Sequence, residues 1–204
     1  MAQDNPQTAK VKPERRAGKR VPKKITESYL HNSGLYYLQR FAASTSRFRS
    51  VMLRKVKKSC HAHPEQDYEA CAQLVEALVL KFEAAGLLND ELYTNGAVAS
   101  MRRRGLSQKA VLAKMAQRGI GANNALLALQ AYDAEESYGD ETRDSEFQAA
   151  LMFARRKKIG PFRNMSVAED EKTQQKALSA LARAGFSYDV SRRVLEAQTD
   201  DFIL

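Results

Sequence analysis

Two segments show the pattern on which the chain is built: Lys109-Ala-Val-Leu-Ala-Lys-Met-Ala-Gln-Arg-Gly119-Ile120 and Gln175-Lys-Ala-Leu-Ser-Ala-Leu-Ala-Arg-Ala-Gly185-Phe186. They align without a gap at a shift of 66 residues, which places Leu112 on Leu178 and Gly119 on Gly185. Apolar residues three and four apart, followed by glycine, are typical of an amphipathic helix that ends in a left-handed residue. A more degenerate copy covers residues 50–58. Internal similarity of this kind predicts an array of helical repeats.

Each copy lies between two further helical segments. The preceding helix ends in bases near 38–40, 101–104 and 153–158, and the following helix covers roughly 67–85, 123–134 and 188–198. The five prolines lie outside the long periodic runs, and no segment shows the alternation of a strand. We therefore predict an all-α fold, an elongated array of three tandem three-helix repeats at residues 26–88, 89–136 and 143–200. The acidic residues 137–142 are expected to form a hinge.

The charge of the chain is distributed in bands. The 204 residues carry a formal net charge of +9, and 44% of them are hydrophobic, which is enough apolar content for a folded core. Residues 1–25 combine eight bases with two acids and almost no large apolar side chain, so we predict a disordered basic tail. Basic stretches at 46–64, 92–132 and 150–168 alternate with acidic ones at 65–91 and 133–149. This banding predicts basic faces and an acidic partner, such as nucleic acid or a nucleoprotein.

Several classes of protein are disfavoured by what the sequence lacks. No run approaches the roughly 18 apolar residues of a membrane span, and we expect no secretory signal because the N-terminal residues have no apolar core. Two cysteines make no disulfide framework and suit a reducing cytoplasm. The sequence has no phosphate-binding glycine loop, no nucleophile elbow and only three histidines. We therefore predict a cytoplasmic protein that is not an enzyme and needs no cofactor.

One group of candidate metal ligands comprises Cys60, His61, His63 and Cys71. Imidazole and thiolate are good zinc ligands, but the adjacent Cys60 and His61 are too cramped for a usual chelating pair. Cys71 shares the apolar side of a predicted helix with Leu78, where a buried free thiol is ordinary. We therefore predict no metal site.

The candidate partner-binding residues are the basic side chains that recur in the three copies. On a helix, one broad face is shared by Arg47, Arg54, Lys55 and Lys58, while Met52, Leu53 and Val56 can turn inward. Such charges can also be no more than solvated residues that compensate helix dipoles, each worth about 0.3–1 kcal/mol. Their recurrence at equivalent repeat positions favours a basic stripe along the array. The predicted set is Arg47, Arg49, Arg54, Lys55, Lys57, Lys58, Arg102, Arg103, Arg104, Lys109, Lys114, Arg118, Arg155, Arg156, Lys157 and Lys158.

The order and spacing of these segments resemble the RecX family of regulatory proteins over about residues 35–199. The resemblance is carried by Glu83-Ala-Ala-Gly-Leu-Leu-Asn-Asp-Glu-Leu-Tyr93, Arg102-Arg-Arg-Gly105 and Lys114-Met-Ala-Gln-Arg-Gly-Ile120 in the middle repeat. In the last repeat it is carried by Phe153-Ala-Arg-Arg-Lys-Lys-Ile-Gly-Pro-Phe162, Leu181-Ala-Arg-Ala-Gly-Phe-Ser-Tyr-Asp-Val190 and Arg193-Val-Leu195.

The resemblance implies a non-enzymatic modulator of the RecA recombinase. Members of the family bind the RecA–DNA filament along its helical groove and mostly inhibit its recombinase and coprotease activities. The chain departs from the family pattern in its basic tail, in the segment 60–67, which looks inserted, and at Ser191, where an apolar residue is usual.

Two other functions remain open at the level of sequence. One is a stand-alone DNA-binding regulator of helix-turn-helix type, with residues 108–118 and 123–132 as its helix pair. The second of these helices carries Asn123, Asn124 and Gln130 but no Arg or Lys to grip base edges. The other is a helical scaffold for a different acidic protein. In addition to RecA, we expect weak, sequence-independent DNA binding, no contact with membranes and a monomeric state.

Overall fold

A computed structural model describes residues 21–137, 144–163 and 170–197, and every regular element in these ranges is helical. The elements are α1 (Glu27–Leu38), α2 (Thr45–Ala62), α3 (Tyr68–Ala84), α4 (Asp90–Arg103), α5 (Gln108–Gln117), α6 (Ala122–Glu136), α7 (Ser145–Lys157), the short 3-10 helix η1 (Gly160–Phe162), α8 (Glu171–Arg183) and α9 (Tyr188–Glu196). The prediction of an all-α fold is confirmed. The predicted tail as far as residue 20, and the predicted hinge from residue 138, lie outside the described residues.

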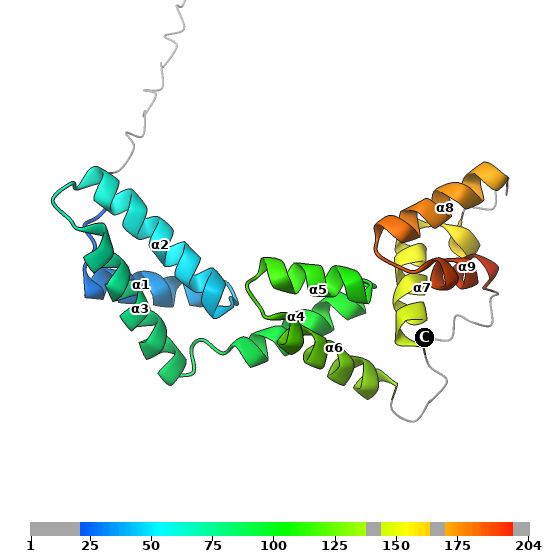
Figure 1. Ribbon diagram of the computed structural model, residues 1–204, viewed down its shortest axis with the longest axis horizontal. Coiled ribbons are helices and arrows are strands. Elements are labelled where there is room, and N and C mark those ends of the chain that lie inside the picture. Colours follow the sequence, from blue (N-terminus) through cyan, green and yellow to red (C-terminus); the bar gives the residue numbers. More distant parts are fainter. Residues whose placement is uncertain (1–20, 138–143, 164–169, 198–204) are drawn as a thin grey trace, which may run out of the picture.

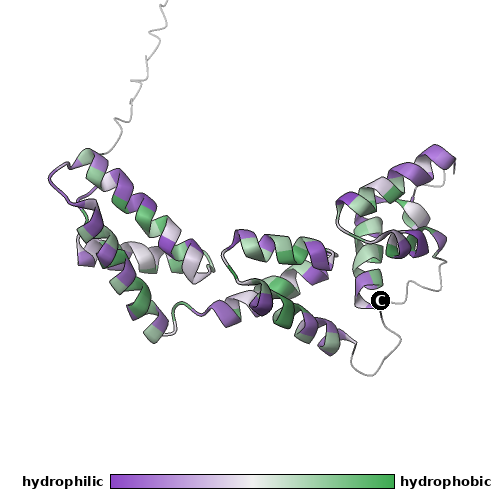
Figure 2. Cartoon of the chain, viewed as in Figure 1, coloured by the Kyte–Doolittle hydropathy of each residue, from purple (hydrophilic) through white to green (hydrophobic). Residues whose placement is uncertain are grey.

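The helices form three bundles, each around its own apolar core (Figure 1). The helices carry both hydrophobic and hydrophilic residues, as expected when each helix buries one side (Figure 2). Helices α1–α3 enclose the largest buried side chains, Phe48 and Phe82, whose rings pack 5.4 Å apart. Val98, Met115 and Leu129 centre the core of α4–α6. Leu151, Leu181 and Val194 centre that of α7–α9. The division of the chain into three sequence repeats stays a prediction.

The ends of the helices follow the signals that the sequence contains. Ser44, Ser107 and Ser187 cap the N-termini of α2, α5 and α9, each by accepting a hydrogen bond from a backbone amide three residues further on. Gly119 and Gly185 end α5 and α8 with φ angles of 77° and 95°, in the left-handed region that glycine enters at little cost. The observed ends of the helices therefore lie within about one turn of the ends predicted from the sequence.

The three bundles lie in a row along a curved line (Figure 1). Helices α2, α5 and α8 run along the inside of this curve, and the other helices lie below them. We call the side formed by α2, α5 and α8 the concave face. The molecule therefore has the shape of a crescent whose inner edge is built from the middle helix of each bundle.

The last residues of the predicted tail pack against the first bundle. The side chain of Gln66 donates to the carbonyl of Ile25 and accepts from its amide, both at 2.9 Å, and Ser59 donates to the carbonyl of Lys23 at 2.8 Å. Ile25 is 4% exposed. The expectation that disorder extends to residue 25 is therefore wrong for these last positions. The loop that follows α2 supplies Gln66, and α2 itself supplies Ser59, so both elements hold these positions.

Candidate anion-binding surface

The two joints between bundles are built from the same contact. At the first joint, the hydroxyl of Ser44, at the start of α2, donates to the carbonyl of Arg118 at the end of α5. At the second joint, the hydroxyl of Ser107, at the start of α5, donates to the carbonyl of Ala184 at the end of α8, at 2.6 Å. Each serine also caps its own helix. The end of α8 therefore meets the start of α5, and the end of α5 meets the start of α2.

An acidic residue from the following bundle completes each joint. Asp90, in the first turn of α4, accepts the backbone N–H of Thr45 at 2.7 Å. Glu146, in the first turn of α7, accepts the backbone N–H of Gln108 at 3.1 Å. Both amides belong to the first turn of a helix, where backbone N–H groups have no partner within the helix and a carboxylate is stabilised by the helix dipole. The same chemistry at both joints aligns the middle helices along the concave face.

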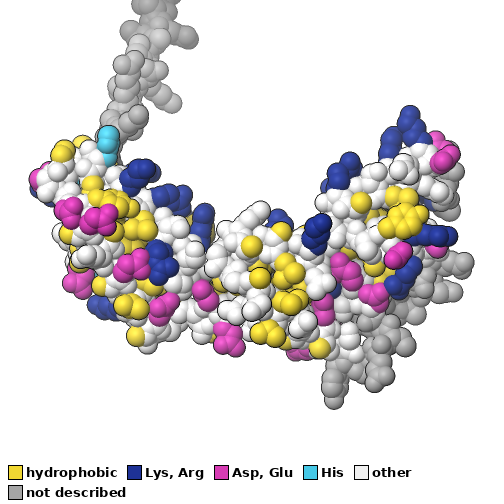
Figure 3. Space-filling view, in the orientation of Figure 1, with side chains coloured by type: hydrophobic (Ala, Val, Ile, Leu, Met, Phe, Trp, Pro, Cys, Tyr) yellow, Lys and Arg dark blue, Asp and Glu magenta, His cyan; other side chains and the backbone are white. Residues whose placement is uncertain are grey.

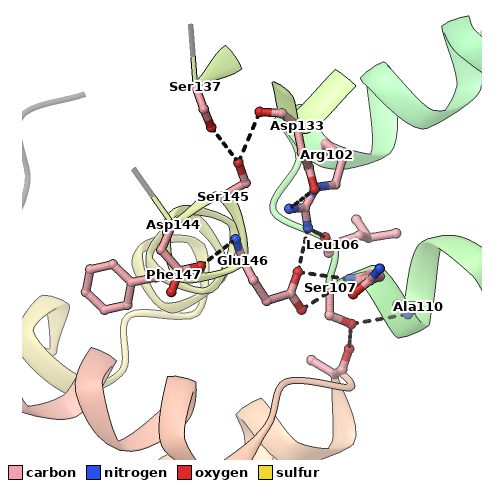
Figure 4. A network of polar contacts seen from close by, with 12 residues as sticks. Arg102, Leu106, Ser107, Ala110, Asp133, Ser137, Asp144, Ser145, Glu146 and Phe147 are labelled. Atoms are coloured by element: carbon pink, nitrogen blue, oxygen red, sulfur yellow. Dashed lines mark hydrogen bonds and ion pairs between the residues drawn. The ribbon is translucent and has the colours of Figure 1, made fainter. Parts of the chain in front are cut away.

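Arg102 adds an ion-pair clamp to the second joint. Its guanidinium is clamped between Asp133 of α6 and Glu146 of α7, with N···O distances of 2.8 Å to each, and it also donates to the carbonyl of Leu106 at 3.0 Å (Figure 4). Arg102 is 4% exposed. The prediction that Arg102 belongs to a basic surface stripe is therefore wrong, because its guanidinium is buried and ion-paired between two bundles.

The carboxylate of Asp144 caps the start of α7. Burial raises its pKa, but hydrogen bonds from Arg193 and from the amide of Phe147 outweigh burial and hold the pKa below the ordinary value. The Arg193 guanidinium lies 2.6 Å from Asp144 and 4.4 Å from the centre of the Phe147 ring. Asp144 is therefore an ionised cap that ties α7 to α9.

The two neighbours of Arg102 lie in different surroundings from it and from each other. Arg103 is exposed and lines a small hollow of about 80 Å³ that also contains Tyr132, Asp133 and Glu136. Burial and the nearby Glu136 raise the pKa of Tyr132 in this hollow. Arg104 is exposed on a different groove, described next, which has no acidic lining residue. Only Arg104 of these three arginines therefore joins an uncompensated basic cluster.

Each joint is flanked by a groove. The first inter-bundle groove, about 590 Å³, is lined by Tyr37, Phe41, Ala42, Arg47, Leu92, Tyr93, Gly96, Ala97, Gln117 and Arg118. The second inter-bundle groove, about 500 Å³, is lined by Arg104, Gly105, Leu106, Ala110, Lys114, Arg118, Phe153, Arg156, Arg183 and Ala184. Arg118, at the end of α5, lines both grooves, so it links the cations of one joint to those of the other.

Lys and Arg side chains gather along the concave face. They stand out over α2, α5 and α8, while most of the visible Asp and Glu side chains lie below this edge (Figure 3). Exposed bases on these three helices are Arg47, Arg54, Lys57, Lys58, Lys109, Lys114, Lys172, Lys176 and Arg183. The structure therefore places the basic stripe on the middle helix of each bundle.

The bases of α8 are part of this face but are missing from the sequence-based set. Lys176 and Arg183 lie inside the segment that the internal overlay aligns with α5, opposite Ala110 and Gln117. The overlay does not mark them as basic positions, because Ala110 and Gln117 are uncharged, whereas residues 155–158 form a run of consecutive bases. Of these, Arg156 lines the second groove, while Lys158 forms the left-handed end of α7 with φ 54°.

Two predicted bases of α2 are partly engaged within their own bundle. Arg49 is ion-paired with Glu76 of α3 at 2.9 Å, and the Lys55 ammonium lies 6.0 Å from the centre of the Tyr29 ring. Both side chains are half-buried. They differ in this respect from Arg47, Arg54, Lys57 and Lys58, which are exposed on the same helix.

The cysteine and histidine residues of the first bundle are spread over different environments. Cys71 is buried, and burial together with the adjacent Cys60 raises the pKa of its thiol. The ring of His63 forms a hydrogen bond of 2.8 Å with the carbonyl of Pro22, and His61 is exposed. In the part of the chain that the structure describes, no three His, Cys, Asp or Glu side chains converge as metal ligands would. Among the described helices, none combines the length and apolar character needed to cross a bilayer.

The fold and this surface define an all-α protein built as a crescent of three-helix bundles with a cationic inner edge. No family model matches the sequence. However, the chain is 37% identical over 180 residues to "Regulatory protein RecX" of Myxococcus xanthus (strain DK1622), which covers 88% of this chain and 91% of that protein. It is 29% identical over 174 residues to the protein of the same name from Agrobacterium fabrum (strain C58 / ATCC 33970), covering 85% of each.

Solved structures share the fold. The RecX crystal structure from Lactobacillus salivarius superposes with a TM-score of 0.54 at 19% identity, over 83% of this chain and 94% of that one. A second crystal structure of a RecX regulatory protein gives a TM-score of 0.58 at 19% identity, over 84% and 72%. The chain belongs to the RecX family of regulatory proteins.

Proposed function

We propose that this protein acts in the cytoplasm by binding the RecA–DNA filament in its helical groove, and that it inhibits the recombinase and coprotease activities without a catalytic step of its own. The observation that carries the proposal is the row of exposed bases on the concave face, over α2, α5 and α8. A curved inner edge of one charge sign suits a rod-shaped partner that contains a polyanion.

The physical basis of binding is many modest contacts made at once. Each exposed base adds little by itself, because surface ion pairs are worth about 0–1 kcal/mol. Three bundles joined by hydrogen bonds engage together, so that the second and third bind at a high effective concentration. Occupying the groove excludes incoming duplex DNA and protein substrates, which accounts for inhibition without chemistry.

The test uses charge reversal at the two ends of the concave face. Arg54→Glu/Lys58→Glu on α2, and Lys172→Glu/Lys176→Glu on α8, should each weaken binding to preformed recombinase filaments at least tenfold and relieve inhibition of strand exchange, because multivalent engagement needs both ends. Lys24→Glu/Lys81→Glu is the matched control, since these exposed bases are not part of α2, α5 or α8 and pair with Glu65 and Glu27. Equal inhibition by all three variants would refute the proposal.

A further inference from the structure

We infer that Cys60 and Cys71 form a redox-active dithiol, which reacts with an anionic low-molecular-weight disulfide such as glutathione disulfide and closes into an intramolecular disulfide. The two thiols lie in the first bundle, where α2 ends and α3 begins. The inference concerns a modification site and is independent of the proposed function, because the reaction needs neither recombinase nor DNA.

The two thiols are neighbours in the fold. Cys60 is in the last turn of α2 and Cys71 is in the first turn of α3, on either side of the loop that joins these helices (Figure 1). Cys71 belongs to the core that α1–α3 enclose, and Cys60 packs against that core. A hydrogen bond joins the two thiols. The pair therefore meets the first requirement of a disulfide, which forms without backbone movement only between side chains that already approach each other.

The two thiols differ in their access to a reagent. Cys60 is half-buried and lines a hollow of about 760 Å³, whereas Cys71 is 6% exposed. Burial, together with Cys60, raises the pKa of the Cys71 thiol, and the thiolate is the nucleophile in disulfide exchange. Cys60 is therefore the thiol that attacks the reagent, and Cys71 is the thiol that resolves the product.

The hollow beside Cys60 fits an anionic ligand of moderate size. Its bases Arg54, Lys57 and Lys58 are exposed, and within the described residues they form no ion pair. They attract an anion, and the volume lies in the range of about 300–1,000 Å³ that is usual for small-molecule sites. The lining contains bases and apolar surface but no acidic residue: Pro22, Arg54, Lys57, Lys58, Cys60, His61, Ala62 and Tyr68.

The wall of the hollow is fixed by contacts next to the thiol. Ser59, which precedes Cys60, donates its hydroxyl to the carbonyl of Lys23 at 2.8 Å. The ring of His63 forms a hydrogen bond of 2.8 Å with the carbonyl of Pro22. These contacts hold residues 22–23 against the end of α2. The ligand therefore meets a surface that is already formed, which lowers the cost of binding.

The reaction consists of two successive thiol–disulfide exchanges. The Cys60 thiolate attacks one sulfur of the reagent, forms a mixed disulfide and releases one thiolate. The Cys71 thiolate then attacks the Cys60 sulfur, forms the Cys60–Cys71 bond and releases the second thiolate. The two cysteine protons pass through solvent to the released thiolates, so the protein dithiol is oxidised by two electrons and the reagent is reduced by two. Excess thiol reverses both steps, as expected of a transient, redox-sensing disulfide.

The first experiment mixes the reduced full chain with excess glutathione disulfide, quenches samples with acid and follows the intact mass. The wild-type chain should end as a species lighter by two hydrogens, with the bond mapped by proteolysis to Cys60 and Cys71. Cys71→Ala should stop at one bound glutathione, because no thiol remains to resolve the mixed disulfide. Cys60→Ala should react about tenfold more slowly than the wild-type chain, because its remaining thiol is buried.

The second experiment tests the charge of the ligand with cystamine, a disulfide that carries two positive charges. Each rate is divided by the rate of the same reagent with mercaptoethanol, an uncharged thiol. On this scale glutathione disulfide should react about tenfold faster than cystamine at low salt, because the hollow is cationic. Lys57→Gln/Lys58→Gln should reduce this preference severalfold. Lys109→Gln/Lys114→Gln, with the same change in charge at exposed positions of α5, should leave it unchanged.

Each outcome decides the inference. A wild-type chain that stays unmodified, or that keeps one or two bound glutathiones, overturns it. So does a Cys60→Ala variant that reacts as fast as the wild-type chain, or a scaled cystamine rate that equals or exceeds that of glutathione disulfide. Circular dichroism confirms that the variants are folded, and mapping of the wild-type chain decides the matter if a cysteine variant does not fold. No recombinase is present, so this inference and the proposed function can fail separately.

Discussion

Three consecutive arginines illustrate how strongly the role of a residue depends on the direction in which its side chain points. Arg102, Arg103 and Arg104 are indistinguishable as sequence, but successive residues of a helix point about 100° apart. One is buried between Asp133 and Glu146, one faces an acidic hollow, and one lines the basic groove. The two partners of Arg102 are 31 and 44 residues away in sequence. No local pattern contains that information.

The burial of Arg102 leads to a prediction about stability. Arg102→Ala should lower the free energy of unfolding by about 3 kcal/mol, because two carboxylates that are only 27% exposed lose their shared partner. Urea denaturation followed by circular dichroism measures the change.

Arg103→Ala is the matched control, since it removes the same charge one residue further along from an exposed position. It should change stability by no more than about 0.5 kcal/mol. A small and equal effect of both substitutions would show that the clamp in the second joint contributes no stability.

At the scale of helices, most of the fold follows from local signals. Apolar spacing, serine and aspartate caps and left-handed glycines act within a few residues, so the middle helices and their ends could be predicted from the sequence. The joints could not, because the hydroxyl of Ser107 reaches a carbonyl 77 residues away and that of Ser44 reaches one 74 residues away. From the sequence alone, the same serines are predicted only to cap helices.

The double use of Ser107 predicts a larger loss of stability than capping alone. Ser107→Ala should cost about 2 kcal/mol, because it removes both a cap and the hydrogen bond to the next bundle. Ser187→Ala removes a cap from an exposed serine whose hydroxyl makes no such joint with any described residue, and should cost about 1 kcal/mol.

Urea denaturation of the two variants provides the comparison. The difference between them reports the contribution of the joint. Equal losses would mean that the hydroxyl of Ser107 acts on α5 alone and does not couple the second and third bundles.

At the scale of the whole molecule, repetition of one joint produces the surface on which the proposed function depends. Because the end of each middle helix meets the start of the preceding one, α8, α5 and α2 follow one another along the inside of the crescent. Their exposed bases then form one cationic edge although they are spread over residues 47–183. The sequence indicated basic faces separated by acidic ones. The assignment of that edge to the middle helices required the joints.

Electron microscopy of recombinase filaments assembled on DNA, with and without this protein, tests the central claim most directly. The account predicts added density along the helical groove of the filament, with the concave face of the crescent, formed by α2, α5 and α8, turned toward the nucleic acid. Filaments that remain bare at saturating protein, or that carry the crescent with its concave face turned away, would contradict it.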